Sequence, residues 1–377
     1  MRILYVLNDT FKKGGTESVV LNYFYHLDRE KYMVDFMIHT TIDEAETNGV
    51  YLDLTKKGVT VHVVTPRRIS IQQNIADMNL VYKKYKYDIV HAHADCANSL
   101  ILSVAKRNGV KVRIAHSHST EIPVQIRDFK SFLHRGYLEW SRLNVRRIAT
   151  HYMACSDKAG AWLFGKRNVY NGKVYLLNNA VDLDRFRFSD VKREQVRDRL
   201  KINGRYVIGH VGRFSPQKNH PFILDIAEEF KNKGEDVVLV LVGDGPDFID
   251  IKELAEKRGL DNIIFYGVTD QVEDLFQSFD VFILPSLWEG LSVAIIEAQV
   301  NGLPCLVANH ERISKESAIT PLVSFIPINN ASEWRIELLK LKACKQRKDY
   351  TKLIREKGYD IFRECEKLQQ YYTKALE

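Results

Sequence analysis

The sequence predicts an α/β protein with two doubly wound domains, and three observations lead to this prediction. The chain has 377 residues, enough for two domains at roughly 100 to 200 residues each. Its hydrophobic content of 45% and its lack of low-complexity tracts exclude a disordered or fibrous protein. Short apolar runs alternate with amphipathic stretches in both halves, which is typical of parallel sheets covered by helices on both faces.

Strands are predicted wherever a short apolar run is bounded by turn residues. In the first half these runs lie at residues 3–7, 34–38, 59–63, 89–91, 112–115, 152–154 and 174–177. In the second half they lie at residues 206–211, 237–242, 263–266, 281–284 and 304–307. We therefore expect a first domain over residues 1–182, a second over 183–347, and a ligand in the cleft between two facing domains.

The C-terminal segment, residues 348–377, has a charged helical pattern with an apolar stripe. The pattern predicts one long helix. Such a helix either packs on the nearest core as a surface helix or crosses back to brace the first domain.

Charge is distributed unevenly along the chain. The first 177 residues hold 26 Lys+Arg and 16 Asp+Glu, a net charge of +10, so the rest carries −3 of the total of +7. The first half is therefore expected to meet an anionic partner. Nucleic acid is not expected, because the sequence has no helix-turn-helix, RNP or zinc-finger signature. A phospholipid surface fits the charge better.

Cysteine usage and hydropathy indicate a soluble cytoplasmic protein. The five cysteines are odd in number, far apart and without a C-x-x-C pair, which is typical of reduced thiols: Cys96, Cys155, Cys305, Cys344 and Cys365. The N-terminal apolar run of about five residues is too short for a signal peptide. No run approaches the ~18 apolar residues of a membrane helix.

The first predicted strand is followed by a turn that contains Gly14 and Gly15, with a helix expected from about Ser18. Paired glycines allow a backbone to approach a ligand closely, and a helix N-terminus offers N–H groups to a phosphate. The turn lacks the G-x-G-x-x-G spacing of dinucleotide-binding proteins. An ordinary loop glycine pair is the alternative interpretation.

A second candidate site follows the strand at 206–211. Arg213 and Lys218 lie five residues apart in a loop that enters a helix near Asn219. Arginine can bind a phosphate through two hydrogen bonds, and lysine adds a compact charge. Two cations at the end of one strand predict a diphosphate site, with a solvated loop as the alternative.

A third candidate site follows the strand at 281–284. Glu289 is expected at the tip of a loop, and Glu297 about a turn and a half inside the next helix. The amides of Leu291, Ser292 and Val293 would offer N–H donors and the positive end of the helix dipole to a phosphate. A carboxylate further along the helix suits a ribose diol, because it accepts two hydroxyl hydrogens.

Together these motifs resemble the retaining glycosyltransferases of family 4, which have the GT-B fold of two Rossmann-like domains. The matching segments are GGTE at 14–17, RIAHSH at 113–118, NNAVD at 178–182, GRF-x-x-x-KN at 212–219, VGDGP at 242–246 and EGLSVAIIEA at 289–298. The subgroup resembled is the bacterial exopolysaccharide and capsule enzymes of the EpsF type. The resemblance covers essentially the whole chain.

The resemblance implies transfer of a hexose or N-acetylhexosamine from a nucleotide diphosphate sugar, by family frequency a UDP-sugar, to a glycan or polyprenyl-linked acceptor. It implies that Arg213 and Lys218 hold the diphosphate, Glu297 the ribose hydroxyls and Glu289 the sugar hydroxyls, with the glycine loop at 14–15 approaching the phosphate. No metal or other cofactor is implied, because protein cations and a helix N-terminus neutralise the leaving diphosphate. No carboxylate cage for Mg²⁺ is evident in the sequence.

Four histidines, His91, His93, His116 and His118, follow two strands expected to end at the same sheet edge. Two H-x-H pairs raise the alternative of a zinc site, but a catalytic or cleft-lining role explains their position at strand ends. The resemblance favours His116 as the catalytic-region histidine, with His118 as its rival. The implied role is to hydrogen-bond the sugar and stabilise positive charge near the anomeric carbon.

Four residues are candidates for the acceptor side or the cleft. His93 and Asp95 follow the fourth strand, as does Asn98; for Asp95 and Asn98 a helix N-cap is an equally good interpretation. Asn179 resembles the hinge asparagine of the family.

Residues 127–148 form a basic amphipathic pattern, with aromatic and aliphatic residues at helical spacing between arginines and lysines. Such a helix can lie in an anionic membrane interface, here the inner face of the plasma membrane, close to a lipid-linked acceptor. The alternative is a core-facing helix with a solvated basic face.

Two other functions stay open beside glycosyl transfer. A nucleotide-sugar 2-epimerase shares the architecture and would interconvert one nucleotide sugar without an acceptor. A non-catalytic nucleotide-sugar-binding subunit is the other, although the presence of Arg213, Lys218 and Glu289 argues against a decayed site.

Overall fold

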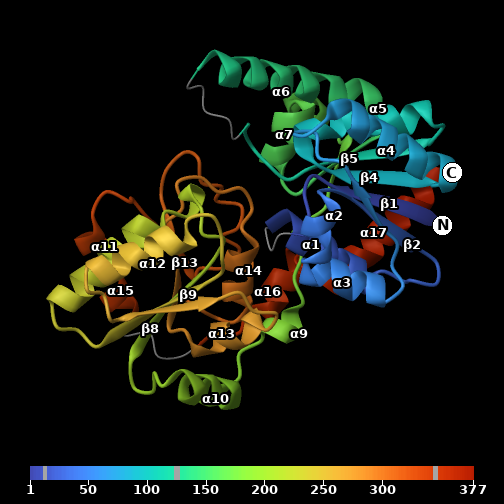
Figure 1. Cartoon of the computed structure of the whole chain (residues 1–377). Coiled ribbons are helices and arrows are strands. Elements are labelled where there is room, and N and C mark those ends of the chain that lie inside the picture. Colours follow the sequence, from blue (N-terminus) through green and yellow to red (C-terminus); the bar gives the residue numbers. More distant parts are fainter. Residues whose placement is uncertain (12–14, 123–127, 343–346) are drawn as a thin grey trace. The chain divides into compact units, whose positions relative to one another are not determined.

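The computed structural model describes residues 1–11, 15–122, 128–342 and 347–377. The chain divides into two compact units (Figure 1). The first unit comprises Met1–Asn179 together with Phe362–Glu377, and the second comprises Ala180–Ile361. Each unit is described by itself.

The first unit contains a seven-stranded sheet in the order β3-β2-β1-β4-β5-β6-β7, in which every pair of neighbours is parallel. Its interior is apolar because the central strands are buried on both faces by helices. The strands are β1 (Arg2–Leu7), β2 (Met33–His39), β3 (Val61–Val64), β4 (Ile89–His93), β5 (Val112–Ser117), β6 (His151–Ala154) and β7 (Val174–Leu176).

Helices connect the strands of the first unit, and short polar side chains fix where several of them begin. Ser70, Asn48 and Ser156 each accept a hydrogen bond from an N–H of the first turn, which satisfies a donor the helix leaves unpaired. The helices are α1 (Gly15–His26), α2 (Ile42–Glu46), α3 (Gly49–Lys56), α4 (Ile71–Lys84), η1 (Asp95–Ala97), α5 (Asn98–Arg107), α6 (Phe129–Ile148), α7 (Asp157–Phe164), α8 (Lys166–Tyr170) and α17 (Ile361–Leu376).

The second unit contains a six-stranded sheet in the order β10-β9-β8-β11-β12-β13, also parallel throughout. Its core includes the buried rings of Phe214, Phe230 and Trp334. The strands are β8 (Tyr206–Val211), β9 (Val237–Val242), β10 (Ile263–Gly267), β11 (Val281–Leu284), β12 (Cys305–Ala308) and β13 (Val323–Ile326). The helices are α9 (Leu183–Phe186), α10 (Asp190–Leu200), η2 (Pro216–Lys218), α11 (His220–Asn232), α12 (Phe248–Lys257), α13 (Val272–Ser278), α14 (Val293–Val300), α15 (Ala331–Lys342) and α16 (Thr351–Glu356).

The structure confirms the predicted fold class, and every predicted strand is present with ends that differ by at most two residues. One strand, β13, was not predicted. It is a four-residue edge strand that pairs only with β12 and lies between Pro321 and Pro327. Because prolines are typical of turns, a short apolar run with a proline close to each end does not stand out as a strand in the sequence.

The prediction of one long helix over 348–377 is wrong. The segment forms two helices, α16 in the second unit and α17 in the first. Gly358 lies between them with a φ of 83°, a left-handed conformation that glycine adopts readily and that ends a right-handed helix. Asp360 then pairs with Val181 in a parallel bridge.

Both sheets reverse their strand order once, between β1 and β4 in the first unit and between β8 and β11 in the second. In doubly wound sheets, ligands bind beyond the carboxyl ends of the strands at such a switch point. The loops after these four strands are therefore where a site is expected.

Candidate functional site

In the second unit, Lys218 and Glu289 meet at the switch point. Lys218 ends η2 in the loop after β8, and Glu289 lies in the loop after β11. The Nζ of Lys218 is 2.5 Å from Oε2 of Glu289, and the two side chains are only 13% and 11% exposed. The Ser286 hydroxyl donates to the same oxygen at 3.2 Å. The site thus holds a cation and an anion that are both largely shielded from solvent.

Hydrogen bonds hold these two loops together. The Leu287 N–H donates to the Gln217 carbonyl at 2.8 Å, and the Gln217 side-chain amide donates to the Trp288 carbonyl at 3.0 Å. The Asn219 side-chain amide donates to the Pro285 carbonyl at 3.2 Å. These contacts fix the loop backbones before any ligand arrives, which preorganises the charged pair.

Two glycines of the VGDGP segment allow the loop after β9 to lie against the loop after β8. A Cβ on Gly243 would lie 2.1 Å from the Gly212 carbonyl oxygen, and its φ of 135° also favours glycine. A Cβ on Gly245 would lie 2.1 Å from the Phe214 carbonyl oxygen. Only glycine fits at either position, because backbone atoms occupy the space.

The sequence predicts Glu289 at the tip of a loop, but the structure places it in a backbone bridge. Its N–H donates to the Arg312 carbonyl at 3.0 Å, and its carbonyl accepts from the Ser314 N–H at 2.9 Å. The residue forms a parallel bridge with Ile313. This bridge turns the carboxylate toward Lys218 and holds it there.

The start of α14 is close to the predicted position. Ser292 is the N-cap residue, but its side chain makes no capping hydrogen bond. Leu291 and Ser292 are buried, and Val293 is the first helical residue. A helix start without a side-chain cap can present its N–H groups to an anion.

Glu297 lies in the fifth position of α14 and is partly buried. Burial raises its pKa to about 7; Arg185 opposes this shift and Glu273 adds to it. Arg185 is itself paired with Glu273, Nη2 to Oε2 at 2.8 Å. Near neutral pH this carboxyl is therefore divided between its neutral and ionised forms.

Arg213 is exposed in the loop after β8. The structure thus brings Lys218 to Glu289, while the guanidinium of Arg213 lies at the surface of the same loop.

In the first unit, the four predicted histidines form one stacked cluster. The ring centroids of His91 and His93 are 4.1 Å apart, as are those of His116 and His118. His91 Nε2 lies 3.1 Å from His116 Nδ1, and His93 Nδ1 lies 3.0 Å from His118 Nε2. The cluster forms because β4 and β5 are adjacent and parallel, so alternate residues project from the same face.

The histidines are uncharged near neutral pH. Burial lowers the pKa of His91, His93 and His116 well below the usual value, and the neighbouring imidazoles lower it further. Burial lowers the pKa of His118 to about 4, against the opposing effect of Asp95. His116 is fully buried, whereas His118 is partly exposed. The cluster can therefore act through neutral ring nitrogens.

Asp95 holds the loop that carries His118. Its Oδ1 accepts from the N–H of His118 at 2.8 Å, and its Oδ2 accepts from the Ser119 hydroxyl at 2.8 Å. Asn98 is buried, accepting from the Ala94 N–H at 2.9 Å and donating to the His116 carbonyl at 3.1 Å. Neither residue caps a helix, so the N-cap alternative is wrong for both.

His91, His93 and His116 could also hold a metal ion, since one nitrogen of each lies within 4.8 Å of the others. Two of these rings are already within hydrogen-bonding distance of one another. His93 is within hydrogen-bonding distance of His118 instead.

The other predicted residues of the first unit lie at separate places. Gly15 begins α1, and a Cβ there would meet no atom of the described residues within 4 Å; Gly14 is outside the described residues. Asn179 is buried and is the last residue of the first unit before the chain enters the second.

The four described cysteines form no disulfide, and Cys344 is outside the described residues.

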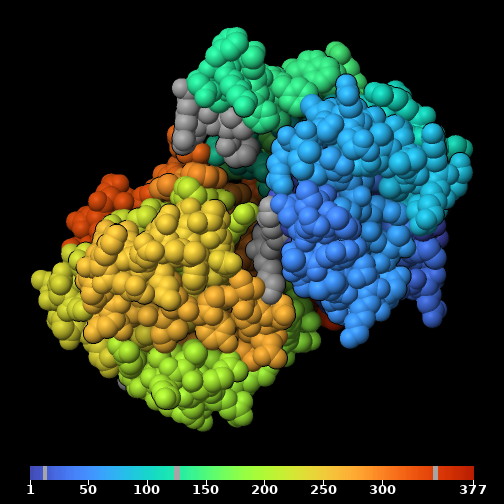
Figure 2. All heavy atoms as spheres, in the orientation of Figure 1, coloured from blue at the N-terminus to red at the C-terminus, as the bar shows by residue number. Residues whose placement is uncertain are grey.

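Helix α6 exposes most of its large apolar residues. Phe129 is 74% exposed and Trp140 61%, and Phe132, Leu133, Tyr137 and Leu143 are exposed as well, whereas Ser141 and Val145 are buried. The side chains of α6, in blue-green, form part of the molecular surface (Figure 2). The core-facing alternative is therefore wrong for this helix; Arg127, at the start of the predicted segment, is outside the described residues.

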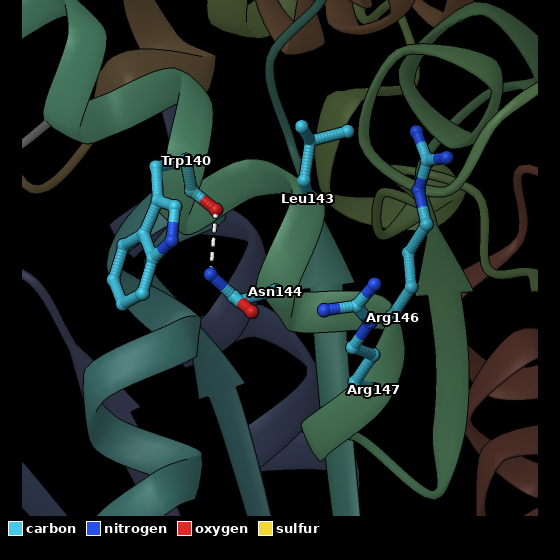
Figure 3. Close-up of a pocket in the computed structure, with 5 residues that line it drawn as sticks. All are labelled: Trp140, Leu143, Asn144, Arg146 and Arg147. Carbon is cyan, nitrogen blue, oxygen red and sulfur yellow. Dashed lines mark hydrogen bonds between the residues drawn. The ribbon is translucent and has the colours of Figure 1, made fainter.

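Arginines attach α6 to the end of α7. Arg142 donates to the Trp162 carbonyl at 2.6 Å, and Arg146 donates to the Leu163 carbonyl at 3.1 Å. A pocket of about 350 Å³ opens beside them, with Trp140 on one side and two arginines on the other (Figure 3). It is lined by Trp140, Leu143, Asn144, Arg146 and Arg147. Among the helices described, none combines the length and the apolar character needed to cross a membrane.

Sequence reasoning missed several residues that contact these sites. Ser286 and Arg185 carried no signal by themselves, although both lie close to quoted motifs in the sequence or in space. Tyr372 belongs to the apolar stripe of the C-terminal segment, where nothing indicates a polar contact, yet its hydroxyl lies 2.7 Å from His91 Nδ1. No pattern connects residues that are 281 positions apart.

Comparison with known proteins gives matches over the whole chain. The family described as Glycosyltransferase Family 4 matches residues 13–185, and the family described as Glycosyl transferases group 1 matches residues 191–356. EpsF of Bacillus subtilis, a glycosyltransferase by name, is 31% identical, and the match covers 100% of this chain and 97% of EpsF.

Two further relatives add a substrate name and a structure. UDP-Gal:alpha-D-GlcNAc-diphosphoundecaprenol alpha-1,3-galactosyltransferase of Escherichia coli is 28% identical, with 78% of this chain and 76% of that protein covered. HepE of Anabaena, solved with UDP-glucose, has a TM-score of 0.76 at 17% identity and covers 99% of this chain and 100% of HepE.

Proposed function

Because the chain belongs to the family 4 glycosyltransferases and has their GT-B fold, we propose that it transfers a hexose or N-acetylhexosamine from a UDP-sugar, with retention at the anomeric carbon. The acceptor is a glycan or a polyprenyl-diphosphate-linked sugar in polysaccharide biosynthesis. The names of the Escherichia coli relative and of the HepE complex support a uridine nucleotide, and the former supports a lipid-linked acceptor.

The observation that carries this proposal is the Lys218–Glu289 pair at the switch point of the second sheet. A shielded lysine here can turn from Glu289 to the donor diphosphate, and the released carboxylate can then accept hydroxyl hydrogens from the sugar. Lys218 would thereby exchange one anionic partner for another, and Glu289 would exchange the lysine for hydroxyl groups that donate to its charge. One ion pair is therefore present in each state.

Other residues of the second unit would complete donor binding. Arg213 would supply a second cation for the diphosphate, and the N–H groups of Leu291, Ser292 and Val293, at and just before the start of α14, would face its negative charge. Glu297 accepts the ribose hydroxyls. In the first unit, Gly15 at the start of α1 would let the backbone approach a phosphate.

In the transfer step, one bond to the anomeric carbon breaks, another forms, and one proton is transferred. The bond between the anomeric carbon and the diphosphate oxygen breaks, and the acceptor oxygen bonds to the same face of that carbon. The acceptor proton passes to the departing diphosphate, which leaves as UDP. His116 or His118 would hydrogen-bond the sugar through a neutral nitrogen and stabilise the positive charge that develops near the anomeric carbon.

Metal independence is part of the proposal, because lysine, arginine and a helix N-terminus can neutralise the leaving group. Transfer measured in EDTA should proceed at the rate found with Mg²⁺. Complete loss in EDTA, restored by Mg²⁺ or Mn²⁺, would contradict this part.

The function is tested by incubating the protein with a panel of UDP-sugars and a polyprenyl-diphosphate-linked sugar. The expected result is a glycosylated acceptor that carries the anomeric configuration of the donor, read by NMR. Conversion of one nucleotide sugar into its epimer without acceptor would instead identify an epimerase. Binding without any turnover across the panel would identify a nucleotide-sugar-binding subunit.

We also propose that the exposed apolar face of α6 rests on the anionic inner surface of the plasma membrane, which places the enzyme on the cytoplasmic side. The support is an apolar stripe that α6 leaves exposed beside Lys130 and Arg147, which are exposed on the same helix. Apolar side chains enter the interface while arginine and lysine meet lipid phosphates.

Co-sedimentation with vesicles tests this contact. Wild type should sediment with phosphatidylglycerol vesicles and much less with phosphatidylcholine, and Trp140→Ser with Leu143→Ser should weaken binding at least about tenfold. Tyr170→Ser, which removes a 92% exposed aromatic from α8, is the control and should bind as wild type. Equal sedimentation with the two lipids would contradict the proposal.

A further inference from the structure

The C-terminal helix α17 is joined to the histidine cluster by a chain of four buried polar groups. The Tyr5 hydroxyl lies 2.8 Å from the Tyr372 hydroxyl, which lies 2.7 Å from His91 Nδ1. His91 Nε2 in turn lies 3.1 Å from His116 Nδ1. All four side chains are at most 1% exposed, and all belong to the first unit.

Each member of this chain is neutral and carries one proton. Burial raises the pKa of Tyr5 and Tyr372 and lowers the pKa of His91 and His116. Three hydrogen bonds connect the four groups, so three protons lie between them and the fourth lies at one end of the chain. The direction of the bonds decides which end.

The two directions give His116 opposite properties. When Tyr5 donates to Tyr372, Tyr372 donates to His91 Nδ1 and His91 Nε2–H donates to His116 Nδ1, so His116 carries its proton on Nε2. In the reverse direction His116 donates from Nδ1, and its Nε2 is a bare acceptor. This Nε2 is buried and has no hydrogen-bond partner among the described residues, so none of them decides directly whether it donates or accepts.

We propose that Tyr372 is a positioning residue whose hydroxyl sets the tautomer of His91 and, through it, whether Nε2 of His116 donates or accepts a hydrogen bond. The inference rests on the proposed function in one respect, that this cluster hydrogen-bonds the transferred sugar. A fixed tautomer removes the free-energy cost of selecting one when substrate binds.

Attachment of α17 does not depend on the Tyr372 hydroxyl alone. The Tyr32 hydroxyl donates to the Gln369 carbonyl at 3.0 Å and lies 3.0 Å from the Thr373 hydroxyl, without contact to the histidines. Tyr32→Phe therefore removes a hydroxyl from the same interface and is a matched control for Tyr372→Phe.

The test is ¹⁵N NMR of histidine-labelled protein, with His116 assigned by comparison with His116→Asn. Tyr372→Phe should give His116 a mixture of tautomers. Tyr5→Phe leaves Tyr372 only His91 as partner in the chain, so His116 should carry its proton on Nε2 whatever the wild-type state. Tyr32→Phe should leave the wild-type spectrum.

Kinetics supply the second readout. Tyr372→Phe should lower kcat about tenfold with the donor KM within about twofold, and Tyr32→Phe should change neither. An unchanged His116 tautomer in both Tyr372→Phe and Tyr5→Phe would overturn the proposal. So would equal losses of kcat in Tyr372→Phe and Tyr32→Phe, or one equivalent of zinc bound through these histidines in the purified protein.

The NMR result does not require turnover. If the tautomers change as expected in a protein that transfers no sugar, the proposed role of Tyr372 is supported and only the proposed function is contradicted. Transfer activity together with unresponsive tautomers would do the reverse.

Discussion

The two units place different chemistry at equivalent positions. Beyond the switch point of the second sheet lies a charged pair, Lys218 and Glu289, held in loops that three hydrogen bonds tie together. Beside the switch point of the first sheet lies a neutral cluster of imidazoles supported by tyrosines. We propose that the charged pair binds the donor diphosphate and that the neutral cluster hydrogen-bonds the uncharged sugar.

This difference also separates two ways of building a site. The charges of the second unit depend on backbone contacts and on glycines that let loops approach. The histidines of the first unit depend on strand pairing and on a side chain from the far end of the sequence. Substitution of Lys218 in the second unit should therefore weaken donor binding, and substitution of the clustered histidines in the first unit should lower kcat.

The largest effect is expected from Lys218→Ala. Loss of this cation leaves Glu289 as an unpaired carboxylate at the diphosphate site, so kcat/KM should fall roughly 10² to 10³-fold. Steady-state kinetics with a UDP-sugar measure the effect. Lys340→Ala, which removes an exposed lysine of the same unit, should retain full activity; a similar loss there would show that net charge and not the site is responsible.

A smaller loss is expected from His116→Asn and His118→Asn. Removal of one hydrogen bond to the sugar should lower kcat about 10- to 100-fold while the donor KM changes little. His26→Asn on α1 is the control. The variant with the larger loss of kcat identifies the histidine that contacts the sugar, and full activity in both would remove the cluster from the mechanism.

Gly243→Ala should act on stability. The new Cβ would meet the Gly212 carbonyl oxygen at 2.1 Å, so the unfolding free energy should fall by roughly 2 kcal/mol or more. Urea unfolding followed by tryptophan fluorescence measures it. Gly136→Ala, in open space on α6, should be neutral or slightly stabilising, and equal behaviour of the two variants would exclude the close approach as the cause.

The smallest effect is a pH dependence of donor binding. Because the pKa of Glu297 is raised to about 7, the carboxyl is neutral below that pH and ionised above it. The ionised form accepts ribose hydroxyls better, so affinity for UDP-glucose should rise up to about tenfold from pH 6 to pH 8. Glu297→Gln should flatten this profile, whereas an unchanged slope would assign it to another group.

The strands and the positions of the loops after β8 and β11 could be predicted because their signals are local. Apolar runs mark buried parallel strands, and Lys218 and Glu289 lie in motifs that follow such runs directly. What failed depended on distant or conformational detail. The left-handed Gly358 divides the predicted C-terminal helix into two, and the short strand β13 lies between two prolines.

The hydrogen-bonded chain from Tyr5 through Tyr372 and His91 to His116 is the feature that sequence reasoning could least predict. Tyr372 occupies an apolar position of an amphipathic helix, where an aromatic ring is expected for packing alone. Its hydroxyl acquires a partner only because α17 lies against the first sheet beside β4. Contacts at such separation have no periodicity from which they could be inferred.

The central claim is that nucleotide binding belongs to the second unit and the histidines of the first serve turnover. Calorimetric titration of UDP into wild type, Lys218→Ala and His116→Asn tests it most directly. The account predicts a Kd at least about tenfold weaker in Lys218→Ala and within about twofold of wild type in His116→Asn. Undiminished UDP affinity in Lys218→Ala, or a large loss in His116→Asn, would contradict it.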